Sequence, residues 1–216
     1  MCRATTTRAF AELDDRRYRR CDRCEATFLA SPLPSADAER REYELHQNRI
    51  DDAGYRRFLS KVADPLVERL APASEGLDYG CGPGPALAAM LRAHGHRVAV
   101  YDVFFAPDPA PLSATYDFVT ATETIEHFHH PASEFERLDR LLRPGGWLAI
   151  STCFQTEDRR FADWHYRRDP THVVFYRAAT LRHLARDHGW SLEIPREDVA
   201  LMQKRLPARS PRRRPR

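Results

Sequence analysis

The chain has 216 residues, of which 42% are apolar and 30% charged, and its formal net charge is +3. This length suits one domain with a small appendage, and the apolar fraction excludes a chain that is disordered throughout. No apolar stretch approaches the roughly 18–20 residues that a membrane helix needs. The first residues also lack the apolar segment of a secretory signal. We therefore expect a soluble, cytoplasmic protein without a membrane partner.

The charges are distributed unevenly along the chain. Lys204–Arg216 is rich in arginine and proline and has no acidic residue, whereas the rest of the chain is mildly acidic. We expect residues 205–216 to form a disordered basic tail rather than an arm that binds nucleic acid. The 5 cysteines are an odd, scattered set and do not indicate a disulfide framework. The oligomeric state cannot be predicted from these patterns.

The hydrophobic pattern divides the chain into segments. Residues 35–72 read as helical over 36–48 and 55–70, with Pro65 predicted to kink or break the second helix. From residue 73 to 204, strands and helices alternate and end in a predicted hairpin. This alternation predicts an α/β fold with a mainly parallel, doubly wound sheet, which binds ligands at the carboxyl ends of its strands. The expected strands cover 76–79, 97–101, 117–122, 147–152, 191–194 and 198–203, and the expected helices cover 85–94, 133–142 and 178–188.

A glycine-rich loop lies between the first strand and first helix of this alternating region. Its glycines follow a G-x-G-x-G pattern, whereas a dinucleotide-binding loop would place its last glycine where this chain has Pro85. Asp102 follows the next strand, where a carboxylate can accept hydrogen bonds from ribose hydroxyls. These residues predict a site for a nucleoside-containing cofactor. The candidates in the loop are Asp78, Gly80, Gly82 and Gly84.

Residues 40–204 resemble the class I S-adenosylmethionine-dependent methyltransferases. The glycine loop, Asp102, Tyr116–His127 and Leu141–Thr152 occur in the order of that family's motifs. The resemblance implies a Rossmann-like fold and S-adenosylmethionine as cofactor. It also implies that the three glycines border the methionine part, Asp78 helps to hold the amino group, Asp102 holds the ribose and Glu123 lies near the sulfonium. Only 13 residues separate Asp102 from Tyr116, so we expect the family's third strand to be abbreviated.

Two histidine-bearing segments are candidates for the acceptor side. His127 follows the strand at 117–122, and His172 lies in a W-x-Y-x-x-D-x-T-H segment similar to one in small-molecule methyltransferases. Either histidine is a candidate base or acceptor-orienting group, with Asp169 as the partner that sets a tautomer. The alternative is that each histidine caps a helix or fills a polar niche in the core. We expect no metal site at these histidines.

Two further regions carry candidate ligands. Tyr43 and Tyr55, in the helical region, are expected to contact the cofactor carboxylate or the acceptor, and the alternative is that they lie on an exposed helix face. Cys21 and Cys24 look like one knuckle of a zinc ribbon, of which related methyltransferases carry two. Only Cys2 lies upstream, so residues 1–34 read as a degenerate zinc-ribbon-like segment, with zinc as an additional cofactor whose ligand set is incomplete.

The expected organisation is thus a zinc-ribbon-like segment at 1–34, a helical lid at 35–72, a methyltransferase core at 73–204 and a basic tail at 205–216. The expected function is methyl transfer from S-adenosylmethionine to a small molecule, at oxygen, with nitrogen or carbon as other acceptor atoms. Two alternatives are an NAD(P)-dependent oxidoreductase of Rossmann type and a non-catalytic adaptor that binds zinc or nucleic acid.

Overall fold

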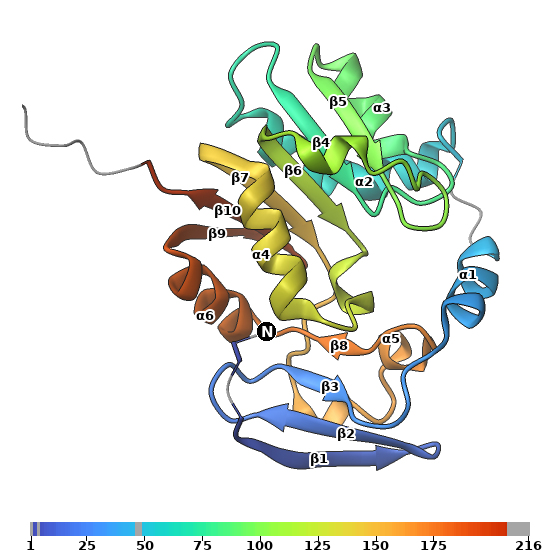
Figure 1. Cartoon of the computed structure of the whole chain (residues 1–216). Coiled ribbons are helices and arrows are strands. Elements are labelled where there is room, and N and C mark those ends of the chain that lie inside the picture. Colours follow the sequence, from blue (N-terminus) through green and yellow to red (C-terminus); the bar gives the residue numbers. More distant parts are fainter. Residues whose placement is uncertain (1, 4, 46–48, 207–216) are drawn as a thin grey trace, which may run out of the picture.

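The main sheet has six strands in the order β5-β4-β6-β7-β10-β9 in the computed structural model, which describes residues 2, 3, 5–45 and 49–206 (Figure 1). Strands β5, β4, β6 and β7 run parallel, and β10 pairs antiparallel with both β7 and β9. The mainly parallel α/β fold predicted from the sequence is therefore confirmed. The strands are β4 (Glu75–Tyr79), β5 (Arg97–Tyr101), β6 (Tyr116–Thr122), β7 (Leu142–Ser151), β9 (Trp190–Arg196) and β10 (Val199–Lys204).

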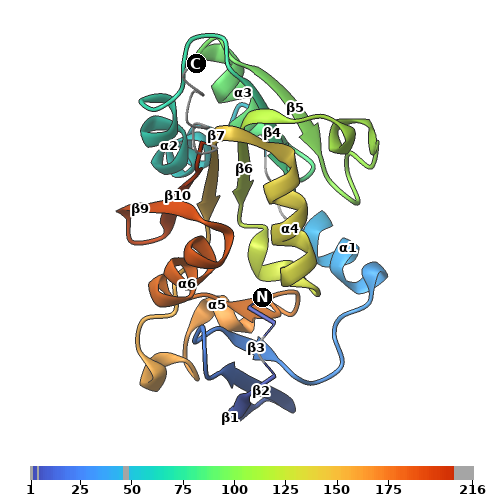
Figure 2. The same ribbon diagram turned by 60° about the vertical axis from the view of Figure 1, so that its left-hand side comes forward.

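Helices cover both faces of this sheet. On one face, α2 (Ala53–Val67) and α3 (Ala86–Ala93) pack against each other and share a core with the sheet. On the other face lie α4 (Pro131–Leu141) and α6 (Ala178–His188), as Figures 1 and 2 show. The apolar residues recur at helical spacing on each helix, so burying them against the sheet orients the helices and produces three layers.

Two local expectations differ from the structure. Helix α2 runs through Pro65 without a break, because Leu59, Val62 and Leu66 bury one continuous apolar face. The strand expected from residue 147 begins earlier, because β7 starts at Leu142, directly after α4, and includes Pro144, Gly145 and Gly146. Gly145 has a φ of 83°, a conformation that glycine adopts without steric cost.

The connection after β5 is short, as the sequence predicted. Asp102 pairs with Ala106 in an isolated antiparallel bridge, and a 3-10 turn follows at Ala110–Ser113 before β6 begins. Within the described residues no strand pairs with the outer edge of β5. The abbreviated third strand therefore leaves a loop, with Phe104 and Phe105 at its turn, beside the carboxyl end of β5.

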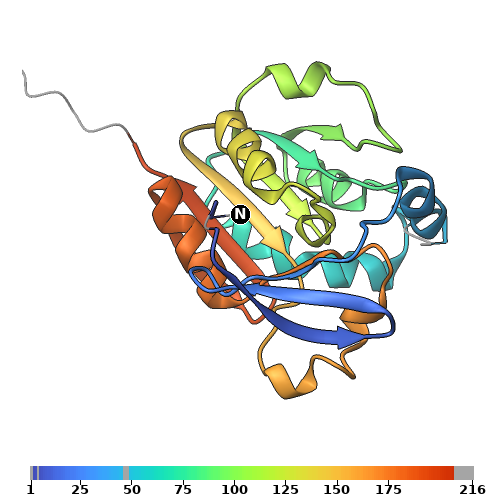
Figure 3. The ribbon, with the colours of Figure 1, turned by 60° about the horizontal axis from the view of Figure 1, so that its bottom comes forward.

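The N-terminal residues form a second, smaller sheet in the order β1-β2-β3-β8. Its strands are β1 (Thr7–Leu13), β2 (Arg16–Cys21), β3 (Thr27–Leu29) and β8 (Val174–Phe175), and all its pairings are antiparallel. Because β8 comes from the methyltransferase-like region, its pairing with β3 joins the N-terminal segment to that region. Figure 3 brings this sheet to the front, with α1 (Ala36–Glu44) leading from it towards α2.

Parts of the predicted lid and tail, residues 46–48 and 207–216, lie outside the described residues. None of the helices in the described ranges combines the length and apolar character needed to span a membrane.

Candidate active site

A cavity of about 600 Å³ opens where β4 and β6 end. The chain leaves β4 towards β5 on one side, whereas β6 pairs with the other side of β4, so the strand order reverses here. In doubly wound sheets, ligands bind at such a point, beyond the carboxyl ends of the strands. The cavity volume falls within the range of about 300–1,000 Å³ that is usual for small-molecule sites.

The glycine loop after β4 forms the floor of this cavity. Gly80 has a φ of 74°, and a Cβ there would lie 2.4 Å from Cγ2 of Thr124, so only glycine fits. Gly82 has a φ of 63°, and a Cβ there would meet nothing within 4 Å. Both glycines line the cavity, whereas Gly84 does not. The loop therefore exposes backbone to a ligand at Gly80 and Gly82.

Asp78 lies behind the loop rather than in the cavity lining. Its carboxylate accepts a hydrogen bond of 2.7 Å from Oγ1 of Thr120, and the side chain is buried. Burial raises the pKa of Asp78 to about 6. Any role of Asp78 towards a ligand is thus transmitted through the loop, as the resemblance implied.

Asp102 joins the glycine loop to the loop after β5. Its Oδ2 accepts a hydrogen bond from the N–H of Gly82 at 3.0 Å. Its Oδ1 accepts from the N–H groups of Phe104 and Phe105 at 2.8 and 3.0 Å. The carboxylate therefore holds the glycine loop and the loop after β5 in place. Oδ1 already accepts two hydrogen bonds, so the lone pair left for a donor from a ligand is on Oδ2.

Aromatic side chains close the cavity. The Tyr43 ring lies 5.6 Å from that of Phe104 and 5.1 Å from that of His127. Tyr55 stacks on Phe58 at 6.4 Å, and burial raises its pKa to about 12. Burial also raises the pKa of Tyr43, so both phenols stay protonated at neutral pH. The structure thus places Tyr43 and Tyr55 in the same cavity as the glycine loop and Asp102.

Two carboxyl groups meet beneath the acceptor side of the cavity. Glu123 lines the cavity and has a φ of 48°, a strained conformation for a residue other than glycine. The Tyr166 hydroxyl lies 3.1 Å from Oε2 of Glu123 and 2.6 Å from Oε1 of Glu126. Burial and the nearby Glu123 charge raise the pKa of Glu126 well above its usual value. Burial and the neighbouring charge therefore favour the neutral form of the Glu126 carboxyl.

His127 and His172 lie side by side, with ring centroids 4.7 Å apart. Nδ1 of His127 is 3.1 Å from the carbonyl oxygen of Thr171, and Nδ1 of His172 is 2.7 Å from that of Tyr166. Because a carbonyl oxygen only accepts hydrogen bonds, each Nδ1 donates, and the lone pair of each neutral ring resides on Nε2. The tautomer of both histidines is thus set by backbone carbonyls, where the sequence had suggested Asp169.

Asp169 instead lies on the opposite side of the His172 ring. Its Oδ2 is 3.7 Å from Nε2 of His172, and its Oδ1 accepts hydrogen bonds from the N–H and hydroxyl of Thr171 at 2.8 and 2.6 Å. Burial raises the pKa of Asp169, but His172 and the hydrogen bonds from Thr171 outweigh it and lower the pKa. Asp169 is therefore ionised at neutral pH.

The same region contains a set of atoms that could hold a cation. Ligand atoms of Glu126, His127 and His172 lie within 4.8 Å of one another. The sequence did not lead us to expect a metal here, and it also did not single out Glu126 or Tyr166. Glu126 stands next to His127, and Tyr166 lies inside the W-x-Y-x-x-D-x-T-H segment. Their part in the site becomes visible only in the structure, where both are buried and their side chains are in contact.

The comparisons with known proteins agree with this geometry. A family model described as a methyltransferase domain matches residues 53–193. A biotin biosynthesis bifunctional protein of Bordetella avium is 31% identical over 145 residues, covering 55% of this chain and 30% of that protein. A ubiquinone biosynthesis O-methyltransferase of Leptothrix cholodnii is 30% identical over 100 residues, covering 35% of this chain and 43% of that protein. The chain therefore spans less than half the length of these relatives.

Two solved structures from Burkholderia thailandensis share the fold. One is a 1,6-didemethyltoxoflavin-N1-methyltransferase with bound 1,6-didemethyltoxoflavin and S-adenosylhomocysteine, with a TM-score of 0.57 and 18% identity over 91% of this chain and 99% of that chain. The other is an O-methyltransferase family protein, with a TM-score of 0.50 and 20% identity over 72% of this chain and 61% of that chain. Because the family model covers well over half of the sequence, this chain belongs to the class I S-adenosylmethionine-dependent methyltransferases.

Proposed function

We propose that this enzyme methylates an oxygen atom of a small molecule and that His172 is the base that takes the proton of the acceptor hydroxyl. The observation that carries the proposal is that His127 and His172 line the same cavity as Gly80, Gly82 and Asp102. Among the relatives, the ubiquinone biosynthesis O-methyltransferases support an oxygen acceptor.

The residues at the glycine loop fit the parts of S-adenosylmethionine. Open space beside Gly82 leaves room for the ligand, and the Asp102 carboxylate offers acceptors for ribose hydroxyls. Phe104 and Phe105 provide apolar faces next to that carboxylate for a purine ring. The bound cofactor supplies an electrophilic methyl group, and the carboxylate of Glu123 at the strand end suits its positive charge.

The environments of the two histidines argue for different roles. His172 faces Asp169, which is ionised, so the negative charge of Asp169 stabilises the protonated form of His172. His127 faces Glu126, whose pKa is raised by burial and by the Glu123 charge, so Glu126 offers less negative charge to a protonated His127. With the rings this close, both histidines do not carry a positive charge at once. His172 therefore accepts the acceptor proton, and His127 orients the acceptor while Tyr43 and the aromatic walls exclude water.

The test begins with calorimetric titration of S-adenosylhomocysteine, followed by methyl transfer to a panel of phenols, catechols and aromatic amines. We expect His172→Gln to lower kcat by about 10²–10⁴-fold, the scale of lost base catalysis, with unchanged affinity for S-adenosylhomocysteine. His127→Gln should raise KM more than it lowers kcat. His94→Gln, at the exposed end of α3, is the matched control.

Two results would overturn the proposal. Absence of S-adenosylhomocysteine binding at millimolar concentration would remove the cofactor assignment. Turnover of the amines but not of the hydroxyl compounds would reject the oxygen acceptor, and full kcat in His172→Gln would reject the base.

A further inference from the structure

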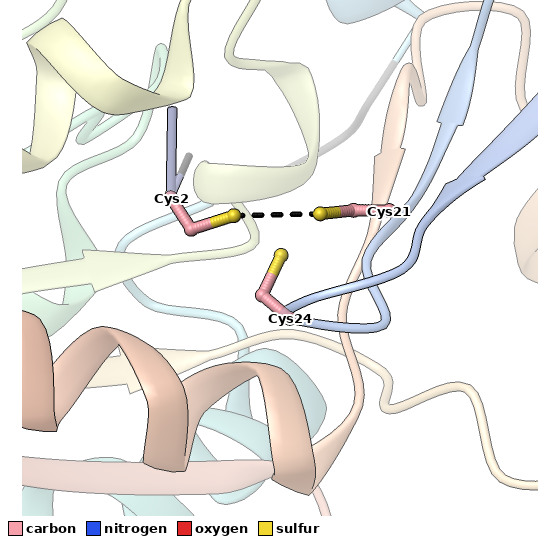
Figure 4. A group of neighbouring side chains, drawn as sticks. All are labelled: Cys2, Cys21 and Cys24. Carbon is pink, nitrogen blue, oxygen red and sulfur yellow. Dashed lines mark hydrogen bonds between the residues drawn. The ribbon is translucent and has the colours of Figure 1, made fainter. Parts of the chain in front are cut away.

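Three cysteine sulfurs meet beside the smaller sheet (Figure 4), and none of these cysteines lines the active-site cavity. Cys2 precedes β1, Cys21 ends β2, and Cys24 lies in the turn before β3. The Sγ atoms of Cys2 and Cys21 are 3.4 Å apart, and all three sulfurs lie within 4.8 Å of one another. Cys21 and Cys24 are buried, with 5% and 2% of their surfaces exposed.

The turn between β2 and β3 directs backbone donors at these sulfurs. The N–H groups of Arg23 and Cys24 hydrogen-bond to the sulfur of Cys21, and the N–H of Ala26 hydrogen-bonds to that of Cys24. Glu25 closes the turn with a φ of 61° and donates its N–H to the carbonyl of Cys21 at 3.1 Å. Donors aimed at sulfur stabilise negative charge, so these N–H groups would favour the thiolate form that binds a metal ion.

Pairing in the hairpin explains how Cys2 reaches this turn. Thr7 is the register partner of Cys21, so the segment that precedes β1 returns to the end of β2. The fold therefore brings Cys2 and Cys21, 19 positions apart in the chain, into contact without a disulfide bond between them.

The sulfur separations favour a metal over a disulfide. Tetrahedral zinc with Zn–S bonds of about 2.3 Å holds its sulfur ligands about 3.8 Å apart. A disulfide needs its two sulfurs at about 2.05 Å and would leave the third cysteine unused. Thiolate ligands are selective for soft cations and zinc, whereas calcium and magnesium require oxygen ligands.

The remaining coordination position faces a second cavity, of about 310 Å³, which all three cysteines line. His129 also lines it, but its Nε2 is 2.7 Å from Oε1 of Glu39 and is held there. We propose that Cys2, Cys21 and Cys24 bind one zinc ion, with a small ligand from this cavity, such as water, at the fourth position. The metal ties the start of the described chain to the β2–β3 turn, so its binding energy contributes to folding.

The first test measures zinc in the full chain, purified without a chelating tag, by mass spectrometry. We expect about one zinc ion per chain, falling below about a tenth in the triple variant Cys2→Ser, Cys21→Ser, Cys24→Ser. Cys81→Ser and Cys153→Ser are matched controls, because these cysteines lie outside the cluster, and both should keep the metal.

A second measurement covers the case in which the triple variant does not fold. Cobalt replaces zinc in the unmodified chain, and thiolate-to-cobalt charge-transfer absorption with tetrahedral d–d bands reports sulfur ligation directly. The single variant Cys2→Ser, whose cysteine is the least buried of the three, should weaken both signals while its circular dichroism stays unchanged.

Three outcomes would overturn the proposal. In the first, denaturing thiol titration of the purified chain finds three thiols instead of five, and a mapped Cys2–Cys21 disulfide accounts for the difference. In the second, five thiols are present and neither zinc nor cobalt binds. In the third, zinc persists in a folded triple variant, which would place the metal elsewhere, as at Glu126, His127 and His172. None of these three outcomes depends on cofactor binding, so each of them leaves the proposed function untouched.

Discussion

Asp102 organises more of the active site than any other single side chain described above. It accepts hydrogen bonds from three backbone N–H groups, at Gly82, Phe104 and Phe105. A carboxylate in this position holds two loops in place and still presents a lone pair to a ligand. We therefore expect a substitution of Asp102 to change the affinity for the ligand more than the free energy of unfolding.

We predict that Asp102→Asn weakens S-adenosylhomocysteine binding by about 1.5–3 kcal/mol, the cost of losing hydrogen bonds to a charged group. Asn keeps one acceptor oxygen for the loop N–H groups, but its NH2 group replaces the other acceptor and the negative charge is lost. Asp108→Asn is a matched control, because Asp108 accepts a similar local bond from the N–H of Ala110 yet is exposed. Calorimetry measures both affinities, and an equal affinity in the two variants would contradict the ribose assignment.

Asp78 makes stability depend on pH. Burial raises its pKa from 3.8 to about 6 in the folded chain, so the folded state holds a proton that the unfolded state releases. The stabilising contribution is complete below the unfolded pKa and is lost as the pH rises through about 6.

We predict that Asp78→Asn, which cannot ionise, gains about 3 kcal/mol relative to the unmodified chain between about pH 4 and pH 7. Urea denaturation at several pH values measures this difference. Asp64→Asn, on the exposed face of α2, serves as the comparison. A constant difference between the Asp78 variant and the unmodified chain across this range would show that the carboxyl titrates normally.

At the scale of elements, the short strand β8 connects the two sheets. Phe175 is fully buried, and its ring lies 5.2 Å from that of Phe161 and 6.0 Å from that of Tyr18. The strand begins two residues after His172, so its packing also positions the acceptor side of the cavity.

We expect Phe175→Ala to lower the free energy of unfolding by about 3–5 kcal/mol, as for other large aromatic residues in a core. Leu45→Ala, at a side chain that is 71% exposed, should change it by less than about 0.5 kcal/mol. Chemical denaturation followed by tryptophan fluorescence compares the two. A small effect of Phe175→Ala would mean that the smaller sheet is held by contacts other than β8.

The elements were largely predictable because strands and helices alternate with clear apolar periodicity. The exceptions have physical causes. Helix α2 tolerates Pro65 because burial of its apolar face compensates for the missing backbone donor. The sequence brought Cys2, Cys21 and Cys24 together as an incomplete set of zinc ligands, but only the β1–β2 register shows that Cys2 reaches Cys21. The buried contact between Glu126 and Tyr166 depends on the folded structure, and a sequence pattern does not reveal it.

At the scale of the whole molecule, ligand binding should be visible as added stability. We predict that S-adenosylhomocysteine at about 100 times its Kd stabilises the chain by about 2.7 kcal/mol and raises Tm by about 5–10 °C. NADH should raise Tm by less than about 1 °C, because the glycine loop has Pro85 where a dinucleotide loop has glycine. Differential scanning calorimetry measures both, and a larger shift with NADH would favour the oxidoreductase alternative.

The alternation of strands and helices predicted the parallel core. The short third strand and the positions Gly80, Gly82, Asp102, Glu123, Tyr43 and Tyr55, which all line the cavity, followed from the order of the motifs together with the family resemblance. The sequence did not predict that residues 1–34 pair with β8, since such a long-range pairing leaves no local pattern.

That pairing has a consequence for the acceptor side of the cavity. The wall that carries His172 is fixed partly by strands at the beginning of the chain, whereas the loop that carries Gly80 belongs wholly to the larger sheet. If the acceptor binds beside His172, as we propose, substitutions in the N-terminal strands would alter the wall next to the acceptor and leave the glycine loop unchanged.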